Sequence, residues 1–189
     1  MKKYICLLVF LLILLTSCER KPNELKQTIK VTDQIGNVVE IKEEPTRIVS
    51  GYYISTSICL ALGLKDKLVG IESAYDKRPI YKKSASDILD NIVDVGTAKA
   101  FDLEACLSCN PDLVILPKKA KDYAQTLNEM QISTIVVYPE SDALLKEAIT
   151  LIGTATSKSS EASKLLNYYK EKEELLKTLV EKINLKKNR

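Results

Sequence analysis

The sequence contains no histidine, and this absence limits the chemistry available to the chain. Zinc sites in proteins rely heavily on imidazole ligands, as do many other transition-metal sites. We therefore expect no site for naked zinc or manganese and no resident metal cofactor. The sequence also shows no nucleophile paired with a base, no pair of catalytic carboxylates and no glycine-rich loop that would cradle a phosphate. These absences argue against an enzyme.

The chain also lacks a large net charge. The formal net charge is +3, and it becomes +1 when residues 1–17, which hold two lysines and no acid, are left out. A value so close to zero argues against a nucleic-acid partner. Of the five cysteines, one lies in residues 1–17 and another is Cys18, which leaves an odd set and excludes a full disulfide framework. Cys59 is most simply a small buried apolar residue.

Residues 1–17 are predicted to be a signal peptide. Two lysines precede an apolar run over residues 4–15, which is short for a bilayer span but suits the hydrophobic region of a signal. The run ends in Leu-Thr-Ser-Cys, which resembles a bacterial lipobox, so Cys18 is the expected lipidation site. An ordinary secretory signal that ends in cysteine is the alternative. The polar residues 18–27 would then tether the protein to the extracytoplasmic side of the cell membrane.

Strand and helix patterns alternate along the rest of the chain, which predicts an α/β fold. Residues 28–33 and 38–42 flank a turn and should pair as an N-terminal β-hairpin. Apolar runs of buried-strand length should form a parallel sheet flanked by helices: residues 47–50, 67–71, 92–95, 112–116 and 133–138. Helices are predicted between them: residues 56–62 with Gly63 as cap, residues 120–130, and residues 142–152 with an end near Gly153.

The last segment carries the longest periodic pattern. One apolar stripe runs along it, with lysine and glutamate opposite: Ala162, Leu165, Leu166, Tyr169, Leu175, Leu176, Leu179, Val180 and Ile183. A helix within residues 156–189 would reach about 40 Å, longer than a lobe over residues 28–155 needs for its own closure. Heptads are not sustained, so a helix packed on one or two lobes is favoured over a coiled coil.

Residues 92–116 form the centre of the pattern. They predict a strand, a glycine turn, a short helix, a proline stop and a second strand, which together make a βαβ unit with parallel strands and a right-handed connection. Asp102 is placed to cap the helix. Pro111 should end it, because proline lacks the backbone donor and disfavours helical geometry in the residue before it.

The same stretch resembles the first lobe of the periplasmic binding proteins that serve ABC importers of iron-siderophore complexes, haem and cobalamin. In that family a glycine-containing loop is followed by Asn-Leu-Glu, a short helix and Pro-Asp-Leu-Val. Here Gly96 is followed by Asp-Leu-Glu at residues 102–104 and Pro-Asp-Leu-Val at residues 111–114, so aspartate replaces the usual asparagine. The resemblance extends from about Arg47 to the C-terminal helix.

This resemblance implies a Rossmann-like substrate-binding lobe, a membrane permease as partner, and a metal complex as ligand: a ferric siderophore, haem or cobalamin. It also implies that the long helix is the strut between two lobes. We find no second lobe in the sequence, so we expect a first lobe plus strut from a truncated or split gene. A lone-lobe adaptor lipoprotein that captures no ligand is the alternative.

The candidate ligand-binding residues lie in the loops after the strands, because open parallel sheets bind ligands outside the carboxyl ends of their strands. Aromatic, cationic and hydroxyl side chains gather there: Tyr52, Tyr53, Tyr75, Arg78, Thr97, Lys99 and Lys118. Tyrosine rings suit a macrocycle or an aromatic siderophore, phenolate oxygen ligates ferric iron, and the cations suit anionic groups. Tandem aromatics directly beyond a buried strand single out Tyr52 and Tyr53. The alternative for each residue is an ordinary exposed loop position.

Glu104 is the candidate permease-docking residue. The resemblance implies that this glutamate projects from the lobe and pairs with arginines of the membrane subunit. The alternative is a local role, since an acid in the first turn of a helix suits the helix dipole, by about 0.3 to 1 kcal/mol.

Cys106 and Cys109 form a CxxC motif, which suggests a thiol oxidoreductase as a weaker alternative. The motif lies late in its predicted helix, whereas redox pairs of the thioredoxin type lie at a helix N-terminus, where the thiol pKa is lowered. Cys106 also falls on the apolar face of that helix. We therefore interpret both residues as small buried side chains.

Overall fold

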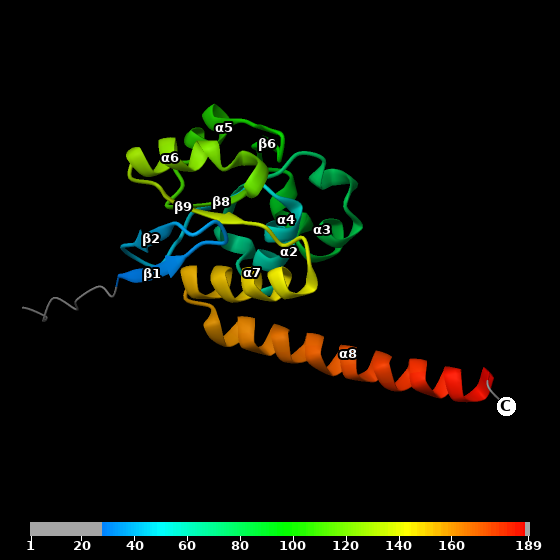
Figure 1. The fold of residues 1–189 in the computed structure, drawn as a ribbon. Helices are drawn as coiled ribbons and strands as arrows, with labels where there is room; N and C mark the ends of the chain where they lie inside the picture. Colours follow the sequence, from blue (N-terminus) through cyan, green and yellow to red (C-terminus); the bar gives the residue numbers. More distant parts are fainter. Residues whose placement is uncertain (1–27, 188–189) are drawn as a thin grey trace, which may run out of the picture.

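The computed structural model describes residues 28–187, with side chains described to residue 183 (Figure 1). The predicted signal peptide, the predicted tether and Cys18 lie outside these residues. Within the part of the chain that is described, no helix combines the length and apolarity that a bilayer crossing requires.

Five strands form one parallel sheet at the centre of the lobe, which confirms the predicted fold class. Their spatial order is β5 (Val93–Asp94), β4 (Leu68–Ile71), β3 (Ile48–Ser50), β8 (Leu113–Pro117) and β9 (Ser133–Val137). Because every neighbouring pair is parallel, the loops that follow the strands all leave the sheet at one edge. We call this the carboxyl edge.

Helices of different lengths connect the strands or follow the last of them. They are α2 (Tyr53–Ala61), η1 (Lys65–Lys67), η2 (Tyr75–Lys77), α3 (Pro79–Ser84), α4 (Ser86–Leu89), α5 (Leu103–Ser108), η3 (Lys118–Ala120), α6 (Asp122–Glu129), α7 (Asp142–Ala155) and α8 (Ser159–Lys187). Figure 1 shows α5 and α6 on one face of the sheet and α2 and α7 on the other. The lobe therefore has three layers.

Successive residues of β3, β4, β8 and β9 supply two separate hydrophobic clusters, one on each face of the sheet. Ile48 and Leu113 belong to the cluster that includes buried residues of α2 and α7. Their neighbours Val49 and Val114 belong to the cluster that includes residues of α5 and α6. Strands buried on both faces explain the continuous apolar runs in the sequence.

Two helix boundaries differ from the prediction by three residues. Helix α2 begins at Tyr53 rather than at residue 56, because the Tyr52 carbonyl accepts the backbone N–H of Thr56 at 2.9 Å. Helix α7 continues through Gly153 to Ala155, so Gly153 is not a cap. A Cβ atom at Gly153 would lie 2.5 Å from the Cβ of Ala162, so glycine permits the close approach of α7 and α8.

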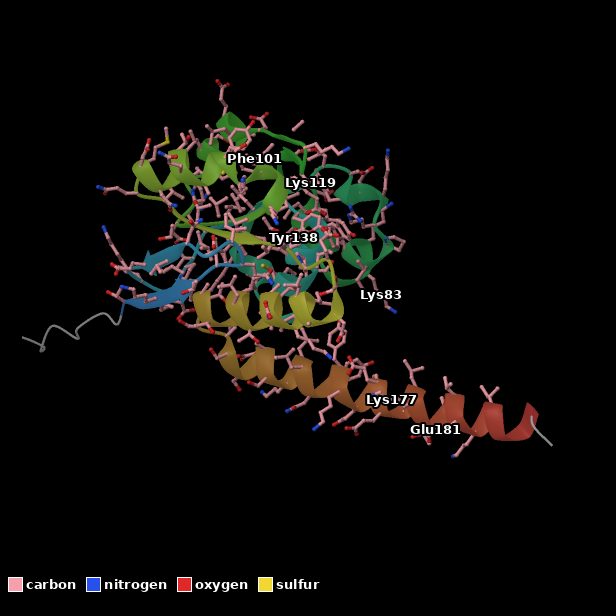
Figure 2. All side chains as sticks on the ribbon, viewed as in Figure 1. Lys83, Phe101, Lys119, Tyr138, Lys177 and Glu181 are labelled. Carbon is pink, nitrogen blue, oxygen red and sulfur yellow. The ribbon has the colours of Figure 1, made fainter. Side chains whose placement is uncertain are left out.

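Helix α8 has a packed first half and an exposed second half. Ala162 is buried, and Leu165, Leu166 and Tyr169 pack against the core cluster on the α7 side of the sheet. Beyond the ion pair between Lys146 Nζ and Glu173 Oε1, 2.7 Å, the apolar side chains of α8 are exposed. Figure 2 shows Lys177 and Glu181 on this part of the helix, past the end of α7. We call residues 174–183 the overhang of α8.

The N-terminal hairpin is confirmed, with β1 (Ile29–Thr32) antiparallel to β2 (Val38–Ile41). Its turn also binds the outer side of β9. Val136 N–H donates to Asp33 Oδ2 at 3.1 Å, Gln34 N–H donates to the Val136 carbonyl at 3.1 Å, and Tyr138 N–H donates to Gln34 Oε1 at 2.8 Å. The hairpin turn thus occupies backbone groups of an edge strand.

The stretch over residues 92–116 has the predicted order, with one added feature. A two-stranded antiparallel ribbon, β6 (Gly96–Thr97) with β7 (Ala100–Phe101), lies between the strand and the helix. Asp102 caps α5 as predicted, since its carboxylate accepts Ala105 N–H at 2.9 Å. Gly96 has a φ of +84°, and a Cβ there would lie 2.2 Å from the Ala100 carbonyl oxygen, so the ribbon requires glycine.

Candidate functional site

Two tyrosines lie where β3 meets α2, at the carboxyl edge. The rings of Tyr52 and Tyr53 pack edge to face, with centroids 4.9 Å apart and an interplanar angle of 70°. Tyr53 lies in the first turn of α2 rather than in a loop, and it is 41% exposed. This exposed ring can stack on a flat ligand.

A cavity of about 260 Å³ opens beside Tyr52. Its walls come from the ends of β3, β8 and β9 and from the ribbon between β6 and β7: Tyr52, Ala98, Pro117, Lys118, Lys119, Val137, Tyr138 and Glu140. Tyr52 OH donates to Glu140 Oε1 at 3.3 Å, and Lys118 Nζ lies 4.2 Å from the centre of the Tyr138 ring. Figure 2 labels Tyr138 and Lys119 at this edge. The cavity therefore combines aromatic walls with cations.

Tyr52 is held as a neutral phenol. Burial raises its pKa above the ordinary tyrosine value, and the negative charge of Glu140 raises it further. Tyr52 can thus donate a hydrogen bond, but a bare phenolate ready to ligate iron is disfavoured in the free protein.

Arg78 contacts the tyrosine pair through the ring of Tyr53. Its guanidinium lies over the ring of Tyr53, 4.4 Å from the centroid, and its Nε donates to Glu72 Oε1 at 3.1 Å. Of the seven residues predicted to bind ligand, Tyr52, Tyr53, Arg78 and Lys118 therefore lie in one continuous group along the edge.

The other three predicted residues have local contacts instead. Tyr75 is partly buried against the core cluster on the α7 side of the sheet. Thr97 Oγ1 accepts Ala100 N–H at 3.1 Å within the small ribbon. Lys99 is exposed in the turn of that ribbon, whereas its neighbour Ala98 lines the cavity.

The structure adds Lys119, Tyr138 and Glu140 to the site. Tyr138 follows the fifth strand directly, so extending the search for loop residues to the end of that strand would have found it and Glu140. Lys119 lies next to Lys118 in η3, the short helix directly after β8. A cluster of histidine, cysteine or acidic side chains able to hold a metal ion is not found among the described residues.

A larger hollow of about 750 Å³ lies elsewhere, between the hairpin, α7 and the first half of α8. Its lining includes Thr32, Leu151 and Leu166, and it carries the Lys146–Glu173 ion pair. This hollow is not formed by the loops that follow the strands of the sheet. We therefore place the candidate ligand site at the carboxyl edge.

The CxxC cysteines are buried, as predicted. Cys106 and Cys109 are free thiols, 0% and 3% exposed. Burial raises the pKa of Cys106 to about 12, and burial raises that of Cys109 as well. Cys59 is also fully buried, and its pKa is raised to about 12. Redox chemistry depends on the thiolate, so these environments disfavour the oxidoreductase alternative.

Comparison with known proteins decides the family. The family model described as periplasmic binding protein matches residues 48–188. The chain belongs to this family. The match covers the sheet from β3 onward together with α8, so it confirms the resemblance carried by residues 92–116.

Relatives of this periplasmic binding protein come from several bacteria. Bacillus subtilis YvrC, described as an ABC transporter substrate-binding lipoprotein, is 29% identical over 147 residues, which cover 75% of this chain and 44% of YvrC. A periplasmic solute binding protein from Veillonella parvula has a TM-score of 0.72 and 28% identity, over 80% of this chain and 48% of that one.

Staphylococcus aureus SirA, whose structure was solved with staphyloferrin B, has a TM-score of 0.62 and 27% identity, over 76% of this chain and 47% of SirA. The chain therefore spans about half the length of the relatives it matches.

In this periplasmic binding protein, Glu104 is exposed in the first turn of α5. It follows the capping residue Asp102 by two positions, and α5 covers the sheet on the face opposite α2 and α7. The Glu104 carboxylate is therefore accessible to a partner protein.

Proposed function

We propose that this protein captures an anionic metal complex at the carboxyl edge and delivers it to the permease of an ABC importer. The observation that carries the proposal is the cavity between Tyr52, Tyr138 and Lys118. Aromatic rings supply flat apolar contact, and Lys118, Lys119 and Arg78 supply positive charge for carboxylate, catecholate or propionate groups.

The relatives support the same class of function. SirA was solved with a siderophore, and YvrC is described as a substrate-binding lipoprotein of an ABC transporter. We infer that the present chain supplies one wall of a ligand cleft, since it spans about half of these relatives. A ferric siderophore is the leading ligand, and haem and a corrinoid are the alternatives.

Tyrosine fluorescence provides the direct test, because the chain has nine tyrosines and no tryptophan. We expect ferric citrate, ferric staphyloferrin B or haem to quench the emission of the full chain saturably. Cyanocobalamin, which carries no net charge, tests the importance of ligand charge. Lys118→Gln should weaken the binding of an anionic complex about tenfold, the effect of one hydrogen bond to a charged group.

Lys83→Gln is the matched control, since Lys83 is exposed on α3 and does not line the cavity (Figure 2). It should bind as the wild type does. If none of the four complexes binds, ligand capture by this chain is wrong. The adaptor alternative then becomes the better account.

Delivery is tested through Glu104. We infer that Glu104 pairs with a cation of the permease, because it is exposed and occupies the position that the family resemblance assigns to docking. Glu104→Arg should abolish uptake or coupled ATPase activity and leave the ligand affinity of the chain unchanged. Normal uptake by this variant would remove the docking role.

The membrane address is a separate part of the proposal. We infer that Cys18 carries a lipid, from the lipobox-like residues before it and from the lipoprotein relative. Metabolic labelling with a palmitate analogue should mark the wild type and not Cys18→Ser. Labelling of both proteins would exclude Cys18 as the modified residue.

A further inference from the structure

A buried polar network lies beside the tyrosines of the site, and Glu72 is its centre. Glu72 directly follows β4, and it is 4% exposed. Thr56 Oγ1 donates to Glu72 Oε2 at 2.6 Å, and Tyr81 OH donates to Glu72 Oε1 at 2.9 Å. Arg78 Nε donates to the same Oε1 at 3.1 Å. Both carboxylate oxygens are therefore engaged, by one partner from α2 and two from the start of α3.

The network also fixes the backbone that carries the two tyrosines. Ser55 Oγ donates to the Tyr52 carbonyl at 2.8 Å, and Tyr81 OH lies 3.0 Å from the Tyr53 carbonyl. Within the described residues, every buried side-chain nitrogen and oxygen has a hydrogen-bond partner. A buried network with all partners present is rigid, since any departure leaves a polar group unpaired.

Arg78 is the one member of this network that also reaches the surface. Its side chain is 33% exposed, whereas that of Glu72 is 6% exposed. Glu72 engages the Nε side of the guanidinium, and Tyr53 covers one of its faces. No hydrogen bond to another described residue engages the two Nη groups. Their four N–H donors therefore remain in a plane that Glu72 and Tyr53 together fix, and two of them can bond one oxyanion in parallel.

We propose that Glu72 is a positioning residue that holds Arg78 as an anion-binding fork beside Tyr53. The fork fits a planar oxyanion, such as a carboxylate of the ligand, through two parallel hydrogen bonds. This inference rests on the proposed function, and it adds a specific subsite to it. Glu72 itself does not touch the ligand.

The proposal predicts that Glu72, although negatively charged, strengthens anion binding. This prediction can be tested by removing its charge. If Glu72 acted only through its charge, then removing that charge would strengthen anion binding, because a carboxylate near the site repels anions. If Glu72 positions Arg78, then Glu72→Gln must weaken anion binding although a negative charge has been removed. The two roles therefore predict opposite changes in affinity.

The experiment uses the full chain labelled with ¹⁵N and follows the Nε–H signals of its four arginines. Arg47 is an internal reference, since its Nε donates to the Cys109 carbonyl at 3.0 Å. In the wild type we expect the Arg78 Nε–H to exchange slowly with solvent and to shift on titration with metal-free citrate. In Glu72→Gln we expect fast exchange of this proton and about tenfold weaker citrate binding.

Two further variants complete the test. Arg78→Lys keeps the charge but loses the planar fork, so it should weaken citrate binding about as much as Glu72→Gln. The double variant should lose little more than either single variant, because both changes remove the same interaction. Lys83→Gln should bind citrate as the wild type does.

Three results would overturn the proposal: an Arg78 signal that citrate does not shift in the wild type, a Glu72→Gln chain that binds citrate equally or more tightly, and an Arg78→Lys chain with unchanged affinity. Glu72→Gln and Arg78→Lys test the proposal separately, so one of them still decides it if the other variant does not fold. The two proposals can fail separately, because citrate is titrated without metal. If the chain binds no ferric complex, the proposed function is wrong. The titration with metal-free citrate still tests the Arg78 fork.

Discussion

The Glu72 network and the overhang of α8 both depart from the usual distribution of side chains, in opposite directions. Around Glu72, polar and charged groups are buried. On the overhang, Leu175, Leu176 and Leu179 are 45% to 61% exposed. The network finds its partners within the lobe, so its order is a property of the lobe itself. The overhang contributes little to the stability of the lobe, and its apolar face is available for contacts elsewhere.

The largest effect on stability is expected when the buried Glu72 network is disrupted. Glu72→Leu removes the acceptor for Thr56, Tyr81 and Arg78 and leaves a charge partly buried without its partner. We expect a loss of about 3–5 kcal/mol in the free energy of unfolding, measured by urea denaturation. Glu72→Gln keeps a neutral polar side chain of similar size and should lose less stability. Equal stability of Glu72→Leu and the wild type would mean that the network does not hold the lobe together.

The second prediction concerns the packed half of α8, which a substitution in α7 should separate from the lobe. Gly153→Val places side-chain atoms where the Cβ of Ala162 already lies, so α7 and α8 must separate. The expected loss is about 1–3 kcal/mol by thermal unfolding. Thr150→Val, at an exposed position of the same helix, is the matched control and should change stability by less than about 0.5 kcal/mol. A tolerated valine at position 153 would show that the contact between α7 and α8 is loose.

The third prediction concerns pH. Burial raises the pKa of Glu72, although the bonds from Thr56 and Tyr81 and the charge of Arg78 oppose the rise. A carboxyl group with a raised folded-state pKa favours folding most below its unfolded pKa, and this contribution is lost as pH rises through the folded value.

The stability of the wild type relative to Glu72→Gln should therefore decline as pH increases, in unfolding measurements between about pH 4 and pH 8. The titratable groups that face Glu72 are Arg78, Tyr81 and Cys59, and the last two keep their protons because their pKa values are also raised. If the stability of the wild type relative to Glu72→Gln instead increases with pH, then the ion pair with Arg78 outweighs the cost of burying the Glu72 carboxylate.

The smallest expected effect lies on the overhang. Leu176→Lys and Leu179→Lys, singly or together, should change the free energy of unfolding by less than about 0.5 kcal/mol, because both side chains are exposed. Leu165→Lys, the same substitution in the packed half, should destabilise the chain by more. If the overhang variants unfold at clearly lower temperature, then these leucines are covered in solution.

The sequence predicts the parts of the fold that follow from local periodicity. The five parallel strands, the hairpin, the Asp102 cap and the long helix all match the structure, because each depends on patterns within a few residues. The error at α2 is local, because the polar residues Ser55 and Thr56 interrupt the apolar pattern in its first turn. The error at Gly153 has a tertiary cause, because the role of this glycine depends on Ala162 in the next helix.

The candidate site is harder to predict, since its geometry depends on contacts between distant segments. The rule for parallel sheets points to the carboxyl edge, and the structure brings Tyr52, Tyr53 and Lys118 into one region there. The rule does not predict that Tyr75 packs into the core, or that Glu72 holds Arg78. Isolated acids such as Glu72 have no periodicity, and only the folded chain shows their partners.

The turn between β1 and β2 has a consequence for aggregation. Exposed edge strands recruit strands from other molecules and can seed fibrils. Asp33 and Gln34 already hold backbone groups at Val136 and Tyr138, so the outer side of β9 cannot template such growth. At the opposite edge β5 is only two residues long, too short to start a ladder. The lobe can therefore reach high local concentrations without polymerising through its central sheet.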